Sequence, residues 1–128
     1  MADVNRGNRP LSPFMIGPYY RPQWTSMLSI VHRITGCALA FGAILIVWWL
    51  LAAASGPDYF ATADWVVTSW LGQLVLFGCL WALLYHFCNG IRHLIWDTGL
   101  LFDVDKAELA GKMTVVVSVV LTLLVWII

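Results

Sequence analysis

The sequence predicts an all-helical membrane protein with three transmembrane helices. Of its 128 residues, 61% are hydrophobic and only 11% are charged, whereas soluble domains are about half apolar and a quarter charged. Three runs that are nearly free of charge each reach about twenty residues or more, the length that crosses roughly 30 Å of hydrocarbon. The chain also has eight tryptophans, a residue type that concentrates at membrane–water interfaces.

The three apolar runs define the expected helices in chain order, at residues 34–56, 65–91 and 107–128. The stretch Ser55-Gly56-Pro57 is typical of a helix end, and Asp105 followed by Glu108 resembles the capping box that opens a helix. Both connections are expected to be loops. We therefore divide the chain into an N-terminal segment, residues 1–24, and a three-helix anchor domain, residues 25–128.

The basic residues predict how the helices cross the membrane. All seven lie before the first span or around the second connection, namely Arg6, Arg9, Arg21, Arg33, Arg92, Lys106 and Lys112. The first connection carries only Asp58 and Asp64. By the positive-inside rule, the N-terminus is on the cytoplasmic or matrix side and the C-terminus is outside. No secretory signal or transit peptide is recognisable, so we expect a bacterial inner membrane rather than a mitochondrial one. The proline-rich head is expected to lie along the inner surface.

A stripe of polar and small residues follows the second span toward the inner side. His86, Asn89, Gly90 and His93 are spaced so that they share one face of a helix. A histidine within a span is a candidate functional residue, and neutral imidazole is a common ligand of haem iron. The alternative is that His86 only hydrogen-bonds a neighbouring helix.

The charged residues at the inner interface extend this hypothesis. Gly90 would let a flat group approach the helix. If His86 binds iron, then Arg33, Arg92, His32 and His93 could hold the haem propionates.

The spacing along the helix limits how a haem could be held. The nitrogens of two axial ligands face each other about 4 Å apart across the metal. His86 and His93 are about 10 Å apart along one helix, and we expect His32 to lie too shallow to reach the iron. A second protein ligand would therefore come from another chain.

A second candidate site lies on the first helix. Ser26, Ser29 and Arg33 share one face, where a hydroxyl and a guanidinium could bind the carbonyl of a quinone. Spacing alone favours a structural interpretation, in which Arg33 reaches the interface and the serine bonds its own helix. Gly36 and Ala40 are interpreted as a small-residue pair for close helix packing.

Two long motifs carry a resemblance to a known family. SIVHRITG, residues 29–36, resembles the S-x-x-H-R-x-[ST]-G signature of the cytochrome b subunit of succinate dehydrogenase. HFCNGIRHLIWDTG, residues 86–99, resembles the H-x-x-x-G-[IV]-R-H-[LM]-x-x-D-x-G signature of the same family. RPLSP, residues 9–13, is also typical of it. The resemblance extends over nearly the whole chain.

The resemblance implies a membrane anchor of respiratory complex II. Such an anchor binds haem b and a quinone, ubiquinone or menaquinone, together with a second anchor, an iron–sulfur subunit and a flavoprotein. Alone it would catalyse nothing. Carried over to this sequence, His86 is the axial haem ligand, and His32, Arg33 and His93 lie near the propionates. Ser29 and Arg33 would line the quinone pocket, and the second anchor would supply the other haem ligand within a heterodimeric helix bundle.

One position departs from the family, and two other functions are possible. Many relatives have a histidine where Phe14 follows Pro13 here, so the contact of that histidine is in doubt. The chain could anchor a fumarate reductase, which runs the reaction in the opposite direction. It could also be a haem-free structural or assembly subunit.

Overall fold

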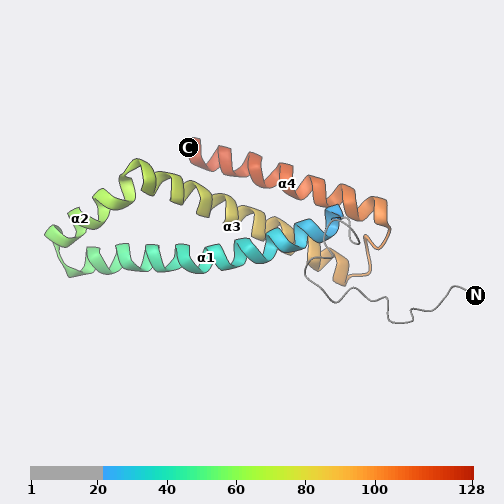
Figure 1. The fold of residues 1–128 in the computed structure, drawn as a ribbon, viewed down its shortest axis with the longest axis horizontal. Helices are drawn as coiled ribbons and strands as arrows, with labels where there is room; N and C mark the ends of the chain where they lie inside the picture. The colour runs from blue at the N-terminus through green and yellow to red at the C-terminus, as the bar shows by residue number, and fades with distance from the viewer. Residues whose placement is uncertain (1–21) are drawn as a thin grey trace, which may run out of the picture.

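The computed structural model describes residues 22–128, so the expectations for the head and for Phe14 lie outside the described residues. Four helices follow one another: α1 (Trp24–Ser55), α2 (Pro57–Thr68), α3 (Trp70–Asp97) and α4 (Val104–Ile127). The long helices α1, α3 and α4 lie side by side with alternating direction (Figure 1), and α3 contacts both of the others. The short α2 joins α1 to α3 at one end of the bundle.

The membrane class is confirmed by the composition of the helices and by the bundle interior. α1, α3 and α4 are long enough to span a bilayer, with mean hydropathies of 2.3, 1.7 and 2.1. Large apolar side chains point outward, as at Phe41 and Trp70, which are 74% and 79% exposed. Small or polar side chains dominate the interior, including Thr35, Ala52, Ala82, Asn89, Thr114, Ser118 and Thr122. This arrangement suits a lipid solvent, in which small and polar residues hold helices together.

The first connection is a helix, not the expected loop. Gly56 turns the chain with a φ of 139°, a conformation that favours glycine. Pro57 then begins α2. Proline is tolerated there because the first N–H groups of a helix have no partner within the helix. Two bonds from α1 hold α2 in place. Trp48 Nε1 donates to Tyr59 Oη at 2.9 Å, and Trp49 Nε1 donates to Asp64 Oδ1 at 3.3 Å.

The second membrane helix begins later than the apolar pattern indicates. Residues 65–68 belong to α2, and Ser69 has an extended backbone (φ −59°, ψ 158°) that separates α2 from α3. The Ser69 hydroxyl oxygen accepts the Gly72 N–H at 3.1 Å and so caps α3. A side chain at Gly72 would collide with the carbonyls of Val66 and Val67, so this sharp turn requires glycine.

The first helix begins ten residues before the apolar run does. α1 begins at Trp24, with Ser26 bonded to the backbone of Gln23. The polar residues before residue 34 do not interrupt the helix, because they occupy only part of its circumference. Ser29, His32 and Arg33 therefore stand on the same rigid helix as the membrane span.

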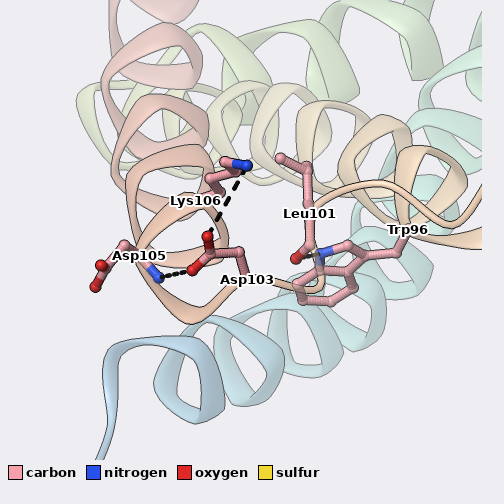
Figure 2. A network of polar contacts seen from close by, with 5 residues as sticks. All are labelled: Trp96, Leu101, Asp103, Asp105 and Lys106. Atoms are coloured by element: carbon pink, nitrogen blue, oxygen red, sulfur yellow. Dashed lines mark hydrogen bonds and ion pairs between the residues drawn. The ribbon is translucent and has the colours of Figure 1, made fainter.

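The turn into α4 corrects the expected cap. α4 begins at Val104, and its cap is Asp103, whose Oδ1 accepts the Asp105 N–H at 3.3 Å. Figure 2 shows this cap with the Lys106–Asp103 ion pair, at 3.9 Å. Beside it, Trp96 Nε1 donates to the carbonyl of Leu101 at 3.1 Å and closes the α3–α4 turn.

Candidate functional site

The ring of His86 lies in the seam between α1 and α3. Its Nδ1 is 3.1 Å from the carbonyl oxygen of His32 and 3.3 Å from the hydroxyl oxygen of Thr35. A carbonyl oxygen can only accept, so Nδ1 carries the proton and Nε2 keeps its lone pair. Glycine at position 36 makes room for the ring, because a Cβ there would lie 3.1 Å from His86 Cε1. The expected close packing at Gly36 is thus confirmed.

Ala40, the other member of the expected small-residue pair, does not take part in this packing. Ala40 is exposed, whereas α1 also approaches α3 closely at Gly42. A Cβ at Gly42 would lie 2.9 Å from Cys79 Sγ. Gly36 and Gly42 therefore both allow side chains of α3 to lie close to α1.

Three histidine rings gather at this seam. The His32 ring stacks on that of His86, with centroids 3.8 Å apart and planes at 14°. It also stacks on His93, at 5.3 Å and 21°. His32 was expected to lie too shallow to reach an iron bound by His86, and the shallower depth on which this expectation rested is wrong, because the two rings lie at the same level. Its depth was inferred from its neighbour Arg33, but the register of α1 against α3 decides which levels meet.

The stack nevertheless does not form a two-ligand clamp. The rings of His32 and His86 lie face to face, whereas two axial ligands point their nitrogens at one metal from opposite sides. His93 Nδ1 is 2.7 Å from the carbonyl oxygen of Asn89. Because that oxygen can only accept, His93 also carries a proton on Nδ1. His32 Nδ1 is buried and has no hydrogen-bond partner among the described residues. Within residues 22–128 no group of three or more His, Cys, Asp or Glu side chains is arranged so that it could hold a metal ion.

Ser29 and Arg33 stand on α1 one turn apart and have open polar groups. Ser29 is half-buried and Arg33 is exposed. Neither side chain makes a hydrogen bond or ion pair with another described residue, so the serine does not bond the carbonyl four residues back. The third residue of this face, Ser26, instead donates to the carbonyl of Gln23 at 2.9 Å. Among the described residues, no hydrogen bond or ion pair joins the side chain of Ser29 or Arg33 to the histidine stack.

Arg92 is not at the surface, where it was expected to meet anionic groups. It is 3% exposed and turned toward α4. Its Nη1 donates to Asn89 Oδ1 at 3.1 Å, and its Nη2 donates to the carbonyl of Ala107 at 3.3 Å. Its guanidinium lies 4.1 Å from the ring centre of Trp96. Arg92 therefore ties α3 to the start of α4, although its Nε and the Asn89 Nδ2 have no partner in this part of the chain.

Two further residues were missed by the motif analysis. Thr35 is 3% exposed and bonds the histidine seam. Tyr85 is fully buried, and its hydroxyl donates to the carbonyl of Leu28 at 2.9 Å. Spacing contained a signal for Tyr85, since Tyr85, Asn89 and Arg92 recur at i, i+4 and i+7. α3 thus has two adjacent polar faces, of which only the one with His86 was recognised.

The helices and the polar seams define a multi-span membrane protein with an open histidine site at the seam between α1 and α3. The family model for the succinate dehydrogenase/fumarate reductase transmembrane subunit matches residues 5–125. The chain belongs to this family. The resemblance seen in its two motifs is therefore confirmed.

Individual relatives agree over nearly their whole length. The chain is 50% identical to the succinate dehydrogenase cytochrome b556 subunit of Paracoccus denitrificans, over 97% of this chain and 94% of that protein. It is 41% identical to the corresponding b556 subunit of Rickettsia prowazekii, over 93% and 91% of the two chains. It is also 36% identical to the cytochrome b560 subunit of Marchantia polymorpha, over 91% and 88%.

Proposed function

We propose that this chain is the membrane-anchor cytochrome b subunit of a succinate:quinone oxidoreductase, complex II, and that His86 supplies one axial ligand to its haem b. The relatives are cytochrome b subunits of succinate dehydrogenase by name. The single observation that carries the ligand assignment is the contact between His86 Nδ1 and the His32 carbonyl. A metal-binding histidine almost always donates its other N–H to such an acceptor.

The surroundings of His86 fit a haem. The proton on Nδ1 leaves the Nε2 lone pair for iron, and Gly36 holds the ring in place. Gly90 lies one turn further along α3 and faces open space. A Cβ placed there would meet no atom of a neighbouring element within 4 Å in the described part of the chain. A flat macrocycle can therefore lie against this face of the helix. When bound between two imidazoles, haem supplies one-electron transfer and has no open position for oxygen.

The neighbouring cationic and imidazole groups fit the propionates of the same haem. His32 Nδ1 is buried without a partner among the described residues, and the Arg33 guanidinium is exposed without an ion pair. His93 Nδ1 donates to the Asn89 carbonyl, and its Nε2 can donate to a propionate when the ring is protonated on both nitrogens. Carboxylates bind strongly to such donors. In this role the three residues orient the haem and do not transfer electrons.

The second axial ligand comes from a second anchor subunit. In this chain the His32 ring lies flat against that of His86, so His32 cannot meet it across a metal. His86 lies at a half-exposed seam rather than in the closed interior. A partner helix that brings one histidine to this seam would complete the site. A haem held in this way would be bound by residues of both anchors.

Ser29 and Arg33 form this chain's side of a quinone site. The serine hydroxyl is free to donate to a quinone carbonyl, and the positive charge of Arg33 stabilises the negative charge that the oxygen gains on reduction. The remaining wall of the pocket comes from the iron–sulfur subunit and the second anchor. The flavoprotein oxidises succinate, and the iron–sulfur subunit delivers the electrons to the membrane. This chain is not catalytic alone.

The distribution of charge supports an inner-side location for both sites. Arg33, Arg92, Lys106 and Lys112 lie on the ends of α1, α3 and α4 that meet at one end of the bundle (Figure 1). Asp58 and Asp64 lie on α2 at the other end. With the basic end in the cytoplasm of a bacterial cell, the N-terminus is cytoplasmic.

The haem assignment is tested by a reduced-minus-oxidised visible spectrum of the purified complex. Wild type should show a low-spin b-type signal that is lost in His86→Ala. Phe87→Leu is the matched control, because Phe87 is adjacent but 61% exposed, and it should keep the signal. A signal that persists in His86→Ala refutes the assignment. If the wild-type complex has no b-type signal, the chain is instead a haem-free structural subunit.

The quinone assignment is tested by comparing two activities of one complex. Ser29→Ala should lower quinone reduction at least tenfold, while succinate oxidation with a soluble dye acceptor is unchanged. Ser55→Ala removes a hydroxyl at the far end of the same helix, where it only bonds the Leu51 carbonyl, and should change neither rate. Equal loss of both activities in Ser29→Ala would mean that assembly has failed and would overturn the assignment.

A further inference from the structure

We propose that Thr35 is a positioning residue for His86. Together with the main-chain carbonyl of His32, its hydroxyl determines which ring nitrogen carries the proton and at what angle the ring stands. This inference rests on the proposed role of His86 as a haem ligand. It adds a residue that touches neither the haem nor the quinone in that proposal.

The hydrogen-bond directions around Thr35 are determined by chemistry. Thr35 Oγ1 donates to the His32 carbonyl at 2.9 Å, so its proton is used there. The same oxygen lies 3.3 Å from His86 Nδ1 with only lone pairs left to offer. The Nδ1–H therefore has two acceptors, the Thr35 hydroxyl and the His32 carbonyl. A proton on Nε2 instead would leave Nδ1 facing two acceptors.

These contacts hold the ring at three points from α1. The two acceptors belong to His32 and Thr35, which are three residues apart on α1. Gly36, the residue after Thr35, lies beside the Cε1 atom of the ring. With only one acceptor, the ring could turn about its Cβ–Cγ bond and keep that hydrogen bond. Thr35 is 3% exposed, so no water readily replaces its hydroxyl. The arrangement therefore restricts the ring angle as well as the tautomer.

The contacts also set the electron density at the ligating nitrogen. Hydrogen bonding from Nδ1–H raises the basicity of Nε2, and a more basic ligand stabilises the oxidised iron. Removing the Thr35 oxygen takes away one acceptor. The haem midpoint potential should then rise, and the low-spin electron paramagnetic resonance signal should shift or broaden, because its g values report the ring angle.

The experiment compares Thr35→Val with Thr35→Ser in the intact membrane complex. Valine keeps the volume of threonine and loses the hydroxyl, while serine keeps the hydroxyl. Thr35→Val should raise the midpoint potential and alter the resonance signal at a wild-type ratio of haem to protein, and Thr35→Ser should restore both. Thr122→Val is the control, because that buried hydroxyl only bonds the Ser118 carbonyl in α4, and it should change neither.

The outcomes separate this inference from the haem assignment. If wild type has a b-type signal that His86→Ala removes, but Thr35→Val leaves the potential and resonance unchanged, Thr35 does not position the ring. Equal shifts in Thr35→Val and Thr35→Ser would also overturn the proposal, because the hydroxyl would not be the cause. If Thr35→Val does not assemble, Thr35→Ala against Thr35→Ser makes the same comparison. A wild-type complex without haem would refute the haem assignment itself.

Discussion

The two adjacent faces of α3 use polar residues in different ways. On one face, Tyr85 and Arg92 are buried and bond to α1 and α4 of the same chain. On the other, His86 and His93 are half-buried, each with one nitrogen bound to a carbonyl and the other left over. Buried polar groups that find partners hold helices together in lipid. Groups that stay open at a seam indicate where a ligand or a second chain completes the structure.

The largest expected effect comes from breaking the closed face at Arg92. Arg92→Leu removes the donor to Asn89 and the bond to the Ala107 carbonyl. It should destabilise the bundle by about 2 kcal/mol, because the buried Asn89 Oδ1 is left without a donor. The complex should then fail to accumulate in the membrane, as measured by immunoblot and by dye-linked succinate oxidation in membranes.

Arg33→Leu is the matched comparison for Arg92→Leu. Arg33 is exposed and has no polar contact with another described residue, so its variant should accumulate normally but lose quinone reduction and the propionate contact proposed for Arg33. If Arg92→Leu accumulates normally but lacks haem, Arg92 belongs to the open face instead.

A smaller and more selective effect is expected from Gly36→Ala on the open face. The added methyl would lie 3.1 Å from His86 Cε1, so the ring must shift by a few tenths of an ångström. Overpacking of this kind costs about 1 kcal/mol or more. The complex should assemble with an altered b-type absorption maximum, read from the difference spectrum.

Gly78→Ala provides the control for Gly36→Ala. Gly78 is also helical, and a Cβ there has nothing within 4 Å in the described chain. Its spectrum should match that of wild type. An unchanged spectrum in Gly36→Ala would show that the ring does not lie against α1 in the assembled complex.

Length and hydropathy were sufficient to predict the three spans. They missed α2, because only eight residues separate the predicted spans, 34–56 and 65–91, and such a short interval shows no clear periodicity. They also place the start of α1 too late, because the polar residues before residue 34 were interpreted as lying outside the helix. Capping at Asp103 rather than Asp105 is a shift of two residues, which local patterns rarely resolve.

The candidate site was predictable only along single helices. The stripe from His86 to His93 follows from the period of one helix. The level of His32 and the direction of Arg92 depend on how α1 and α4 register against α3, which neither hydropathy nor motif spacing encodes. Two neighbours in sequence illustrate this: Arg92 faces α4, whereas His93 faces α1. The ligand roles of His86, Ser29 and Arg33 stay predictions for the experiments above.

The smallest expected effect comes from Tyr85→Phe, which removes one bond from the closed face. The Tyr85 hydroxyl donates to the Leu28 carbonyl at 2.9 Å. Hydrogen bonds between membrane helices contribute about 0.6 kcal/mol on average, because the separated helices find other partners. Tyr85→Phe should therefore lower the thermal midpoint of the detergent-solubilised complex by only a few degrees and leave its haem spectrum unchanged.

Tyr59→Phe is the matched control, because it also removes one tyrosine hydroxyl. Tyr59 is 47% exposed and accepts a bond from Trp48 Nε1, which water or headgroups can replace, so its effect should be smaller still. If Tyr85→Phe instead changes the haem spectrum at unchanged thermal stability, the two faces of α3 are not independent. The hydroxyl of Tyr85 would then act on the histidine seam through α1, because Leu28 lies one turn before His32 on that helix.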